Sequence, residues 1–179
     1  MDFEAKTIQV SIAGKSNPAG LKRDLFYTSL DQVVAIPLLD TQSNSIGIAL
    51  GMRPAVTANP NATPPIAEVK AGKFAQISAS EMDSDFKCEP LGEGDNHAGF
   101  KVMVKAFING KDGKASYLLG QLRNRRLILI VTEKDGTRYL INDITLKYGS
   151  QVNPKRGYSL EGEVILSEEP PIYLGPIAL

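Results

Sequence analysis

Strict alternation of apolar and polar residues is the feature that most narrows what this sequence can fold into. In residues 100–107, Phe, Val, Val and Ala fall on one face, and Lys, Met and Lys fall on the other. Residues 158–166 repeat the pattern, with Tyr, Leu, Gly, Val and Leu against Ser, Glu and Glu. Because successive side chains of a strand point to opposite faces, both stretches predict half-buried β-strands.

The stretch between these two predicted strands combines a helix and a hairpin. Four apolar residues recur at the i, i+3, i+4, i+7 spacing of one helical face: Ala115, Leu118, Leu119 and Leu122. This spacing predicts one helix of about three turns. Residues 127–131 are apolar without alternation, which is typical of a strand covered on both faces. Residues 134–137 supply the Asp-Gly signal of a tight hairpin, and residues 139–144 are its expected partner strand.

Shorter patterns complete the expected fold. Residues 7–12 alternate cleanly, residues 21–39 favour two extended segments with a bend at Asp31, and further short strands are expected near residues 74–78 and 86–91. Eight or nine short strands with one helix predict an antiparallel β-sandwich or barrel with one short helix packed on it. The length of 179 residues favours a single β-rich domain spanning residues 1–179.

Residues 41–67 differ in composition from the rest of the chain. Ser, Asn, Thr, Ala, Gly and Pro dominate there, apart from the apolar residues 46–50, and prolines occupy positions 54, 60, 64 and 65. Such prolines forbid a continuous helix or a central strand across the second half. A loop of this length is unusual in a compact domain. It indicates either an arm that orders against a partner or a loosely ordered surface excursion.

The charge balance argues against a role that depends on a strong overall field. Twenty basic and twenty acidic residues give a formal charge of zero, which offers no general attraction for nucleic acid or an anionic membrane. No apolar run approaches the roughly 20 residues that a membrane helix needs. Residues 1–6 lack a basic start and an apolar core, so no secretory signal is expected.

Residue types that usually carry catalysis are sparse. Cys88 and His97 are each alone, which excludes an internal disulfide and makes a Cys/His metal site unexpected. Cys88 is expected to be a buried structural thiol, and His97 a solvated loop residue. The sequence has neither a Gly-x-Ser-x-Gly motif nor a phosphate-binding Gly-x-x-x-x-Gly-Lys-Ser/Thr motif. Acyl transfer and nucleotide hydrolysis are therefore poorly supported.

Pairs of acidic residues are formal candidates for a glycosidase, which needs only two carboxylates. The pairs are Asp83 with Asp85, Glu93 with Asp95, and Glu161 with Glu163. The last pair lies on the polar face of an amphipathic strand, where exposed carboxylates are expected anyway. The chain also has no Trp on which a sugar ring would stack. We therefore expect no catalytic residue, no cofactor and no metal ion, and a protein that is not an enzyme.

Residues 123–126, Arg-Asn-Arg-Arg, form the sharpest cluster of charge. Cations at the end of the predicted helix would complement the negative end of its dipole. The same side chains could instead contact phosphate groups. The sequence favours the first interpretation and leaves the second open.

Three motifs taken together resemble a known family. They are the helix end Leu-x-Asn-Arg-Arg, the hairpin Asp-Gly-Thr-Arg-Tyr-Leu-Ile-Asn at 135–142, and Arg-Gly-Tyr-Ser-Leu-Glu-Gly at 156–162 followed by Pro170, Pro171 and Tyr173. The chain resembles small structural proteins from the tail modules of bacteriophages and prophages of Bacteroides-type bacteria, and is similar to tail-tube proteins. The similarity covers about the last 80 residues well and the first 95 loosely.

This resemblance implies a non-enzymatic virion component, made in the cytoplasm of the bacterial host, that self-assembles through β-edges and a long loop. Its partners would be copies of itself and neighbouring tail proteins, without a membrane and without specific nucleic-acid binding. Residues 41–67 would contact the adjacent ring, and the residues expected in that interface are Ile46, Ile48, Leu50, Pro54 and Pro60. Glu161 and Glu163 would line a lumen and repel DNA phosphates.

A second class of function stays open at this point. A β-sandwich can also serve as a glycan-binding or host-surface-binding module, with the long loop of residues 41–67 as its contact surface.

Overall fold

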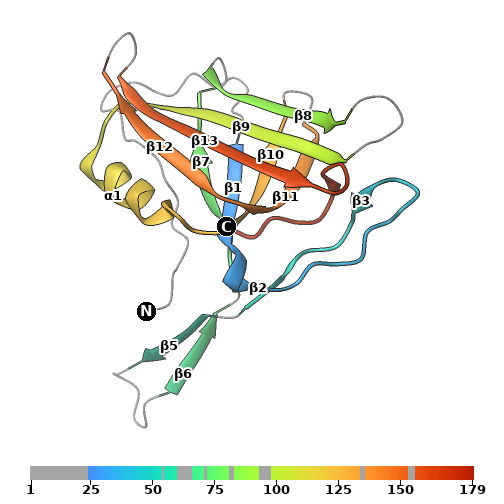
Figure 1. Cartoon of the computed structure of the whole chain (residues 1–179). Helices are drawn as coiled ribbons and strands as arrows, with labels where there is room; N and C mark the ends of the chain where they lie inside the picture. The colour runs from blue at the N-terminus through green and yellow to red at the C-terminus, as the bar shows by residue number, and fades with distance from the viewer. Residues whose placement is uncertain are drawn as a thin grey trace.

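Two β-sheets packed face to face form the body of the protein (Figure 1). The computed structural model describes residues 24–53, 55–59, 66–70, 72–80, 83–92, 98–133, 136–152 and 156–179. The described chain is mainly β, with antiparallel sheets and one short α-helix, so the predicted fold class is confirmed. The strand predicted for residues 7–12 lies outside the described residues.

The larger sheet has six strands and the smaller sheet has four. The six-stranded sheet has the order β3 (Ser45–Ile46), β14 (Ile172–Tyr173), β11 (Arg138–Ile144), β10 (Leu127–Thr132), β1 (Asp24–Ser29) and β7 (Ala75–Ser78). The four-stranded sheet has the order β12 (Leu146–Gln151), β13 (Gly157–Leu166), β9 (Gly99–Asn109) and β8 (Asp85–Leu91). Neighbouring strands in both sheets are antiparallel, except for the parallel pair β14 and β3.

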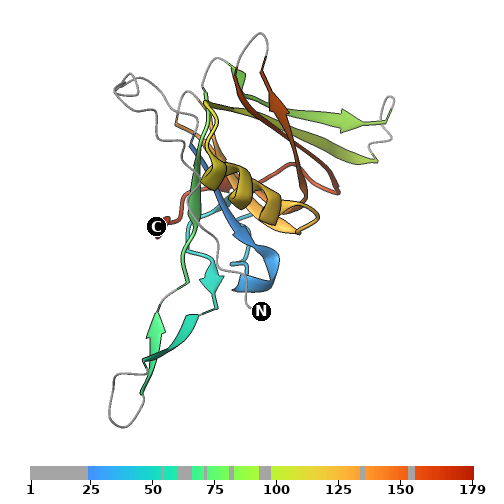
Figure 2. The ribbon, with the colours of Figure 1, turned by 90° about the vertical axis from the view of Figure 1, so that its left-hand side faces the viewer.

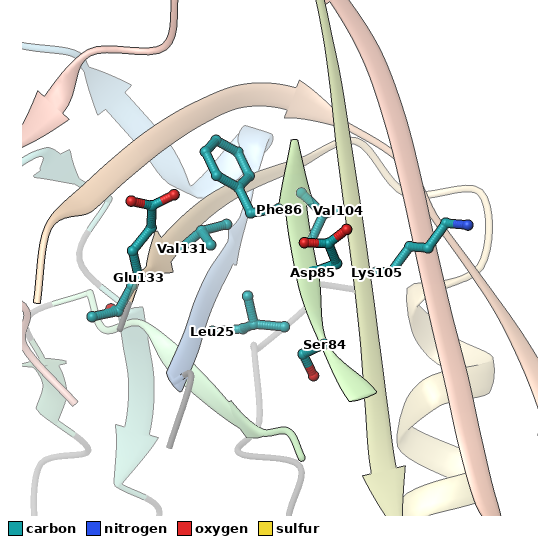
Figure 3. Close-up of a pocket in the computed structure, with 9 residues that line it drawn as sticks. Leu25, Ser84, Asp85, Phe86, Val104, Lys105, Val131 and Glu133 are labelled. Carbon is teal, nitrogen blue, oxygen red and sulfur yellow. The ribbon is translucent and has the colours of Figure 1, made fainter. Parts of the chain in front are cut away.

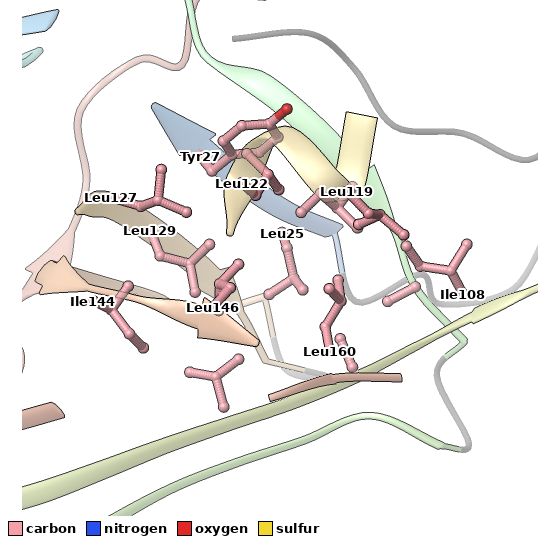
Figure 4. Close-up of a cluster of buried hydrophobic side chains, with 14 of the residues drawn as sticks. Leu25, Tyr27, Ile108, Leu119, Leu122, Leu127, Leu129, Ile144, Leu146 and Leu160 are labelled. Atoms are coloured by element: carbon pink, nitrogen blue, oxygen red, sulfur yellow. The ribbon is translucent and has the colours of Figure 1, made fainter. Parts of the chain in front are cut away.

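The main hydrophobic cluster fills the space between the sheets (Figure 4). Strand β9 contributes Val102, Val104 and Ala106, the inward residues that the alternation predicted, and they are buried. Strand β13 contributes Tyr158 and Leu160 in the same way. The period of two therefore sets which face of the four-stranded sheet meets the core.

Strand β10 is buried on both faces, as its uninterrupted apolar run predicts. Leu127, Leu129 and Val131 face the main cluster, whereas Ile128 and Ile130 face a second cluster on the other side of the six-stranded sheet. All five residues are almost completely buried. A strand of this kind needs a covering layer on each side.

The one α-helix among the described residues, α1 (Gly113–Leu122), closes the main cluster beside β12 (Figures 1 and 2). The Asp112 side chain caps its first turn by accepting a hydrogen bond from the Lys114 backbone N–H at 3.1 Å. The residues predicted to face the core are the buried ones: Ala115, Leu118, Leu119 and Leu122. The Tyr158 hydroxyl donates to the Asp112 carbonyl at 2.9 Å, which ties the start of the helix to β13.

A layer of chain covers the second cluster. After β1, a 3₁₀ turn, η1 (Leu30–Gln32), bends the chain at Asp31 as expected, and β2 (Val33–Ala35) then pairs with β4 (Gly51–Met52). The C-terminal segment adds β14 and contributes Tyr173. A second two-stranded sheet, β5 (Ala55–Asn59) with β6 (Ile66–Lys70), connects this layer to β7.

Candidate interaction surface

The layer over the second cluster also carries exposed apolar side chains. Its inward residues include Ile46 and Leu50, which pack on the six-stranded sheet. Six of the ten large apolar side chains that are exposed in the described part of the chain belong to this layer or to the C-terminal segment. We call these six the cover surface: Val34, Ile36, Leu38, Ile48, Leu174 and Leu179.

Exposure on the cover surface is large for apolar side chains. Leu38 is 97% exposed, and Ile48 and Val34 are 71% and 68% exposed. Ile48 and Leu174 belong to neighbouring segments, because the Leu174 N–H donates to the Ile46 carbonyl at 2.8 Å. Single exposed apolar residues are ordinary, but several of them in one covering layer favour a surface that meets a partner.

The hairpin arm, β5 with β6, extends away from the two packed sheets (Figures 1 and 2). Its five residue pairs run from Ala55 opposite Lys70 to Asn59 opposite Ile66, and neither strand pairs with any other described strand. The prolines at 54, 60, 64 and 65 lie outside the two strands, where they do not interrupt the ladder. An isolated two-stranded hairpin is only marginally stable in water, so an additional contact would stabilise the arm.

The structure changes the predicted interface of residues 41–67. Ile46 and Leu50 are 3% and 5% exposed in the second cluster, because β3 and β4 hold them against the chain's own six-stranded sheet. They are part of the subunit's core and are not available as surface. Ile48 is exposed on the cover surface, whereas Pro54 and Pro60 lie outside the described residues. The other five residues of the cover surface were not predicted. Their local sequence pattern does not show which apolar side chains the six-stranded sheet would bury and which would stay exposed.

Glu161 and Glu163 do lie on the outer face of the four-stranded sheet, but that face is not acidic. Glu161 sits between Lys147 and Lys105 in the strand register. Glu163 forms an ion pair with Lys101, in which the Glu163 Oε1 lies 3.1 Å from the Lys101 Nζ. The face carries four lysines and four carboxylates: Lys87, Lys101, Lys105, Lys147, Asp85, Glu89, Glu161 and Glu163. The explanation that like charges repel DNA phosphates is therefore wrong for this face.

Two of the arginines after α1, Arg125 and Arg126, have side-chain partners within the chain. The Arg125 Nε donates to the Gln121 carbonyl at 3.0 Å, which satisfies a backbone group in the last turn of the helix. Arg126 forms a two-point ion pair with Asp143, at the corner between β11 and β12. Hydrogen bonding from Arg126 lowers the pKa of Asp143. The Arg125 contact supports the helix-end interpretation of the basic cluster, whereas Arg126 pairs with a strand.

The side chains considered for catalysis are spread over the molecule. Asp83 accepts a hydrogen bond from Ser80 Oγ at 3.0 Å, and Asp85 lies 3.9 Å from the Lys87 Nζ. Cys88 is half-buried on the inner face of β8, where burial raises the pKa of its thiol and the nearby Glu169 raises it further. His97, Glu93 and Asp95 lie outside the described residues. No group of three potential metal-ligating side chains occurs among the residues that the structure describes.

No helix in the described part of the chain is long and apolar enough to cross a membrane. Comparison with protein-family models, with curated proteins and with solved structures found no match to this chain.

Proposed function

We propose that this protein is a non-enzymatic structural subunit that assembles with copies of itself through the cover surface and the hairpin arm. The observation that carries the proposal is an arm whose strands pair only with each other in the described chain, next in sequence to a layer that carries exposed apolar side chains. A second copy would supply additional backbone pairing for the strands of the arm, and it would bury the exposed apolar side chains of the cover surface.

The assembly proposed is the tail of a bacteriophage or prophage, on the strength of the resemblance of the last 80 residues. The subunit would then be a virion component, with neighbouring tail proteins as further partners. The buried sandwich would provide a rigid body, and the arm would reach the next copy.

Removing the arm tests the proposal without disturbing the core. Gly72 lies against Met52, since a Cβ built on Gly72 would be 2.5 Å from the Met52 Cβ. The chain therefore leaves and re-enters the body at adjacent points, and a short Gly-Ser linker can replace residues 55–70. We expect light scattering to show large assemblies for the full chain and a smaller species for the arm-deleted chain, with an unchanged circular dichroism unfolding transition.

A second variant tests the cover surface. Leu38→Ser with Ile48→Ser removes two exposed apolar side chains and is expected to weaken assembly. Val152→Ser with Ile165→Ser is the matched control, because these residues are 72% and 62% exposed but lie outside the cover surface. A full chain that stays monomeric at every concentration and binds immobilised glycans would contradict the proposal and support a glycan-binding module.

A further inference from the structure

A cavity of about 220 Å³ lies at one mouth of the sandwich. Its lining comes from β8, from both sides of the β10–β11 hairpin and from the connection between β13 and β14. The lining residues are Phe86, Cys88, Glu133, Tyr139, Glu169 and Pro170. Figure 3 shows the adjoining part of this mouth, where Phe86 and Glu133 come from opposite sheets.

One wall of the cavity is aromatic. The rings of Phe86 and Tyr139 stack with their centroids 5.2 Å apart and their planes inclined by 27°. Phe86 belongs to the four-stranded sheet and Tyr139 to the six-stranded sheet. The stacked pair therefore bridges the two sheets and fixes an apolar surface beside the cavity.

Two carboxylates accompany this wall, and the lysines of β8 and β9 point elsewhere. Alternation along β8 and β9 sends Lys87, Lys101 and Lys105 to the outer face of the sheet, and Figure 3 shows Lys105 directed away from Glu133. Among the described residues, the ion pairs are Lys87 with Asp85, Lys101 with Glu163 and Arg126 with Asp143. None of these includes Glu133 or Glu169.

We propose that this cavity binds a small organic cation, an alkylammonium or guanidinium group. Carboxylates attract the charge, and aromatic rings favour a cation that also has apolar surface. A volume of about 220 Å³ is large enough for one small organic cation. The effect of Glu169 on the thiol of Cys88 agrees with a negative potential inside the cavity. This site is independent of the proposed assembly.

Cys88 provides a direct test, because it is the only cysteine and it lines the cavity. Methanethiosulfonate reagents convert the thiolate to a mixed disulfide and release methanesulfinate. Three such reagents differ in charge: the trimethylammonium-ethyl reagent is cationic, the methyl reagent is neutral and the sulfonatoethyl reagent is anionic. The rate of each with Cys88 is divided by its rate with free 2-mercaptoethanol, which removes the difference in intrinsic reactivity. We expect the cationic reagent to react about tenfold faster than the anionic one at low salt, with a smaller ratio at high salt.

Two variants separate the cavity from the general surface. Glu133→Gln with Glu169→Gln is expected to bring the cationic and anionic rates together. Glu89→Gln is the matched control, because Glu89 adjoins Cys88 in sequence but faces the opposite side of β8, and its ratio should stay unchanged. Each ratio compares reagents on the same thiolate, so a shift in the thiol pKa cancels.

Protection measures binding itself. Tetramethylammonium chloride and the guanidinium compound agmatine are expected to slow labelling by the neutral methyl reagent in a saturable way, while potassium chloride at equal ionic strength does not. Equal rates for the cationic and anionic reagents would overturn the proposal. So would an unreactive Cys88 or the absence of protection by both cations.

Discussion

At the scale of single residues, Thr28 is polar and buried without compensation. Thr28 is only 1% exposed, and its Oγ1 has no hydrogen-bond partner among the described residues. An unsatisfied buried hydroxyl costs about 1–3 kcal/mol, and valine has nearly the same shape. Thr28→Val is therefore expected to raise the free energy of unfolding by about 1 kcal/mol. Urea titration measures this as a higher midpoint at an unchanged slope.

Ser84→Ala is the contrasting control for Thr28→Val. The Ser84 hydroxyl donates to the Ser80 carbonyl and accepts from the Phe107 N–H, so its removal breaks two hydrogen bonds. This variant should be destabilised. A loss of stability in Thr28→Val would show that its hydroxyl has a partner after all.

Gly157 is required by close packing at the start of β13. A Cβ at this position would lie 2.2 Å from the Ile108 carbonyl oxygen and 2.6 Å from the Phe107 ring. Backbone cannot move aside as a side chain can, so Gly157→Ala should cost at least about 2 kcal/mol. Thermal unfolding measures the loss as a lower melting temperature.

Gly113→Ala is the matched control for Gly157→Ala, because a Cβ at Gly113 meets nothing within 4 Å. The substitution lies in the first turn of α1, where alanine is the better helix former. Its melting temperature should stay the same or rise. Equal losses in the two variants would contradict the packing explanation.

At the scale of elements, the ion pair between Arg126 and Asp143 joins the loop after α1 to the corner between β11 and β12. Arg126 lowers the pKa of Asp143, so the folded protein favours the ionised carboxylate. The stability from this shift is present above the unfolded pKa of about 3.9 and is lost as the pH falls through the folded value. The effect is small because both side chains are exposed.

An NMR titration of the Asp143 carboxyl carbon tests this pairing. Its midpoint should lie below the ordinary aspartate value and return toward that value in Arg126→Gln. Arg123→Gln is the control, because the hydrogen bonds to Asp143 come from Arg126. A midpoint that does not respond to Arg126→Gln would rule out the ion pair in solution.

At the scale of the whole molecule, the balanced outer face of the four-stranded sheet should not bind DNA. Three of its four lysines lie opposite carboxylates in the strand register, and Lys87 pairs with Asp85 along β8, which cancels their attraction for phosphates. Glu161→Lys with Glu163→Lys would leave six lysines and two carboxylates. Fluorescence anisotropy should then detect DNA binding that weakens with salt in the variant and no binding in the natural chain. Steep salt-dependent binding by the natural chain would contradict this expectation.

Local patterns predicted the elements of this fold well. Alternation identified β9 and β13, helical spacing identified the buried side of α1, and the Asp-Gly signal identified the β10–β11 hairpin. Each of these three patterns is formed by residues that are close together in the sequence. The role of Asn124 was missed, although its φ of 61° is the left-handed conformation that asparagine tolerates after a helix. The candidate surface was predicted only in part, since burial of Ile46 and Leu50 depends on contacts with strands far away in the chain.

The sequence by itself determined a mainly β fold, either a sandwich or a barrel, with one short helix packed on it, because periodicity decides which faces of strands and helices can be buried. Only the tertiary structure decided which apolar residues stay outside and which charges lie side by side. Val34 and Ile46 are both apolar, yet one is on the cover surface and the other is in the core. Glu161 is acidic, yet strand register places it between two lysines. Surfaces are set by long-range packing, and a local pattern does not contain that information.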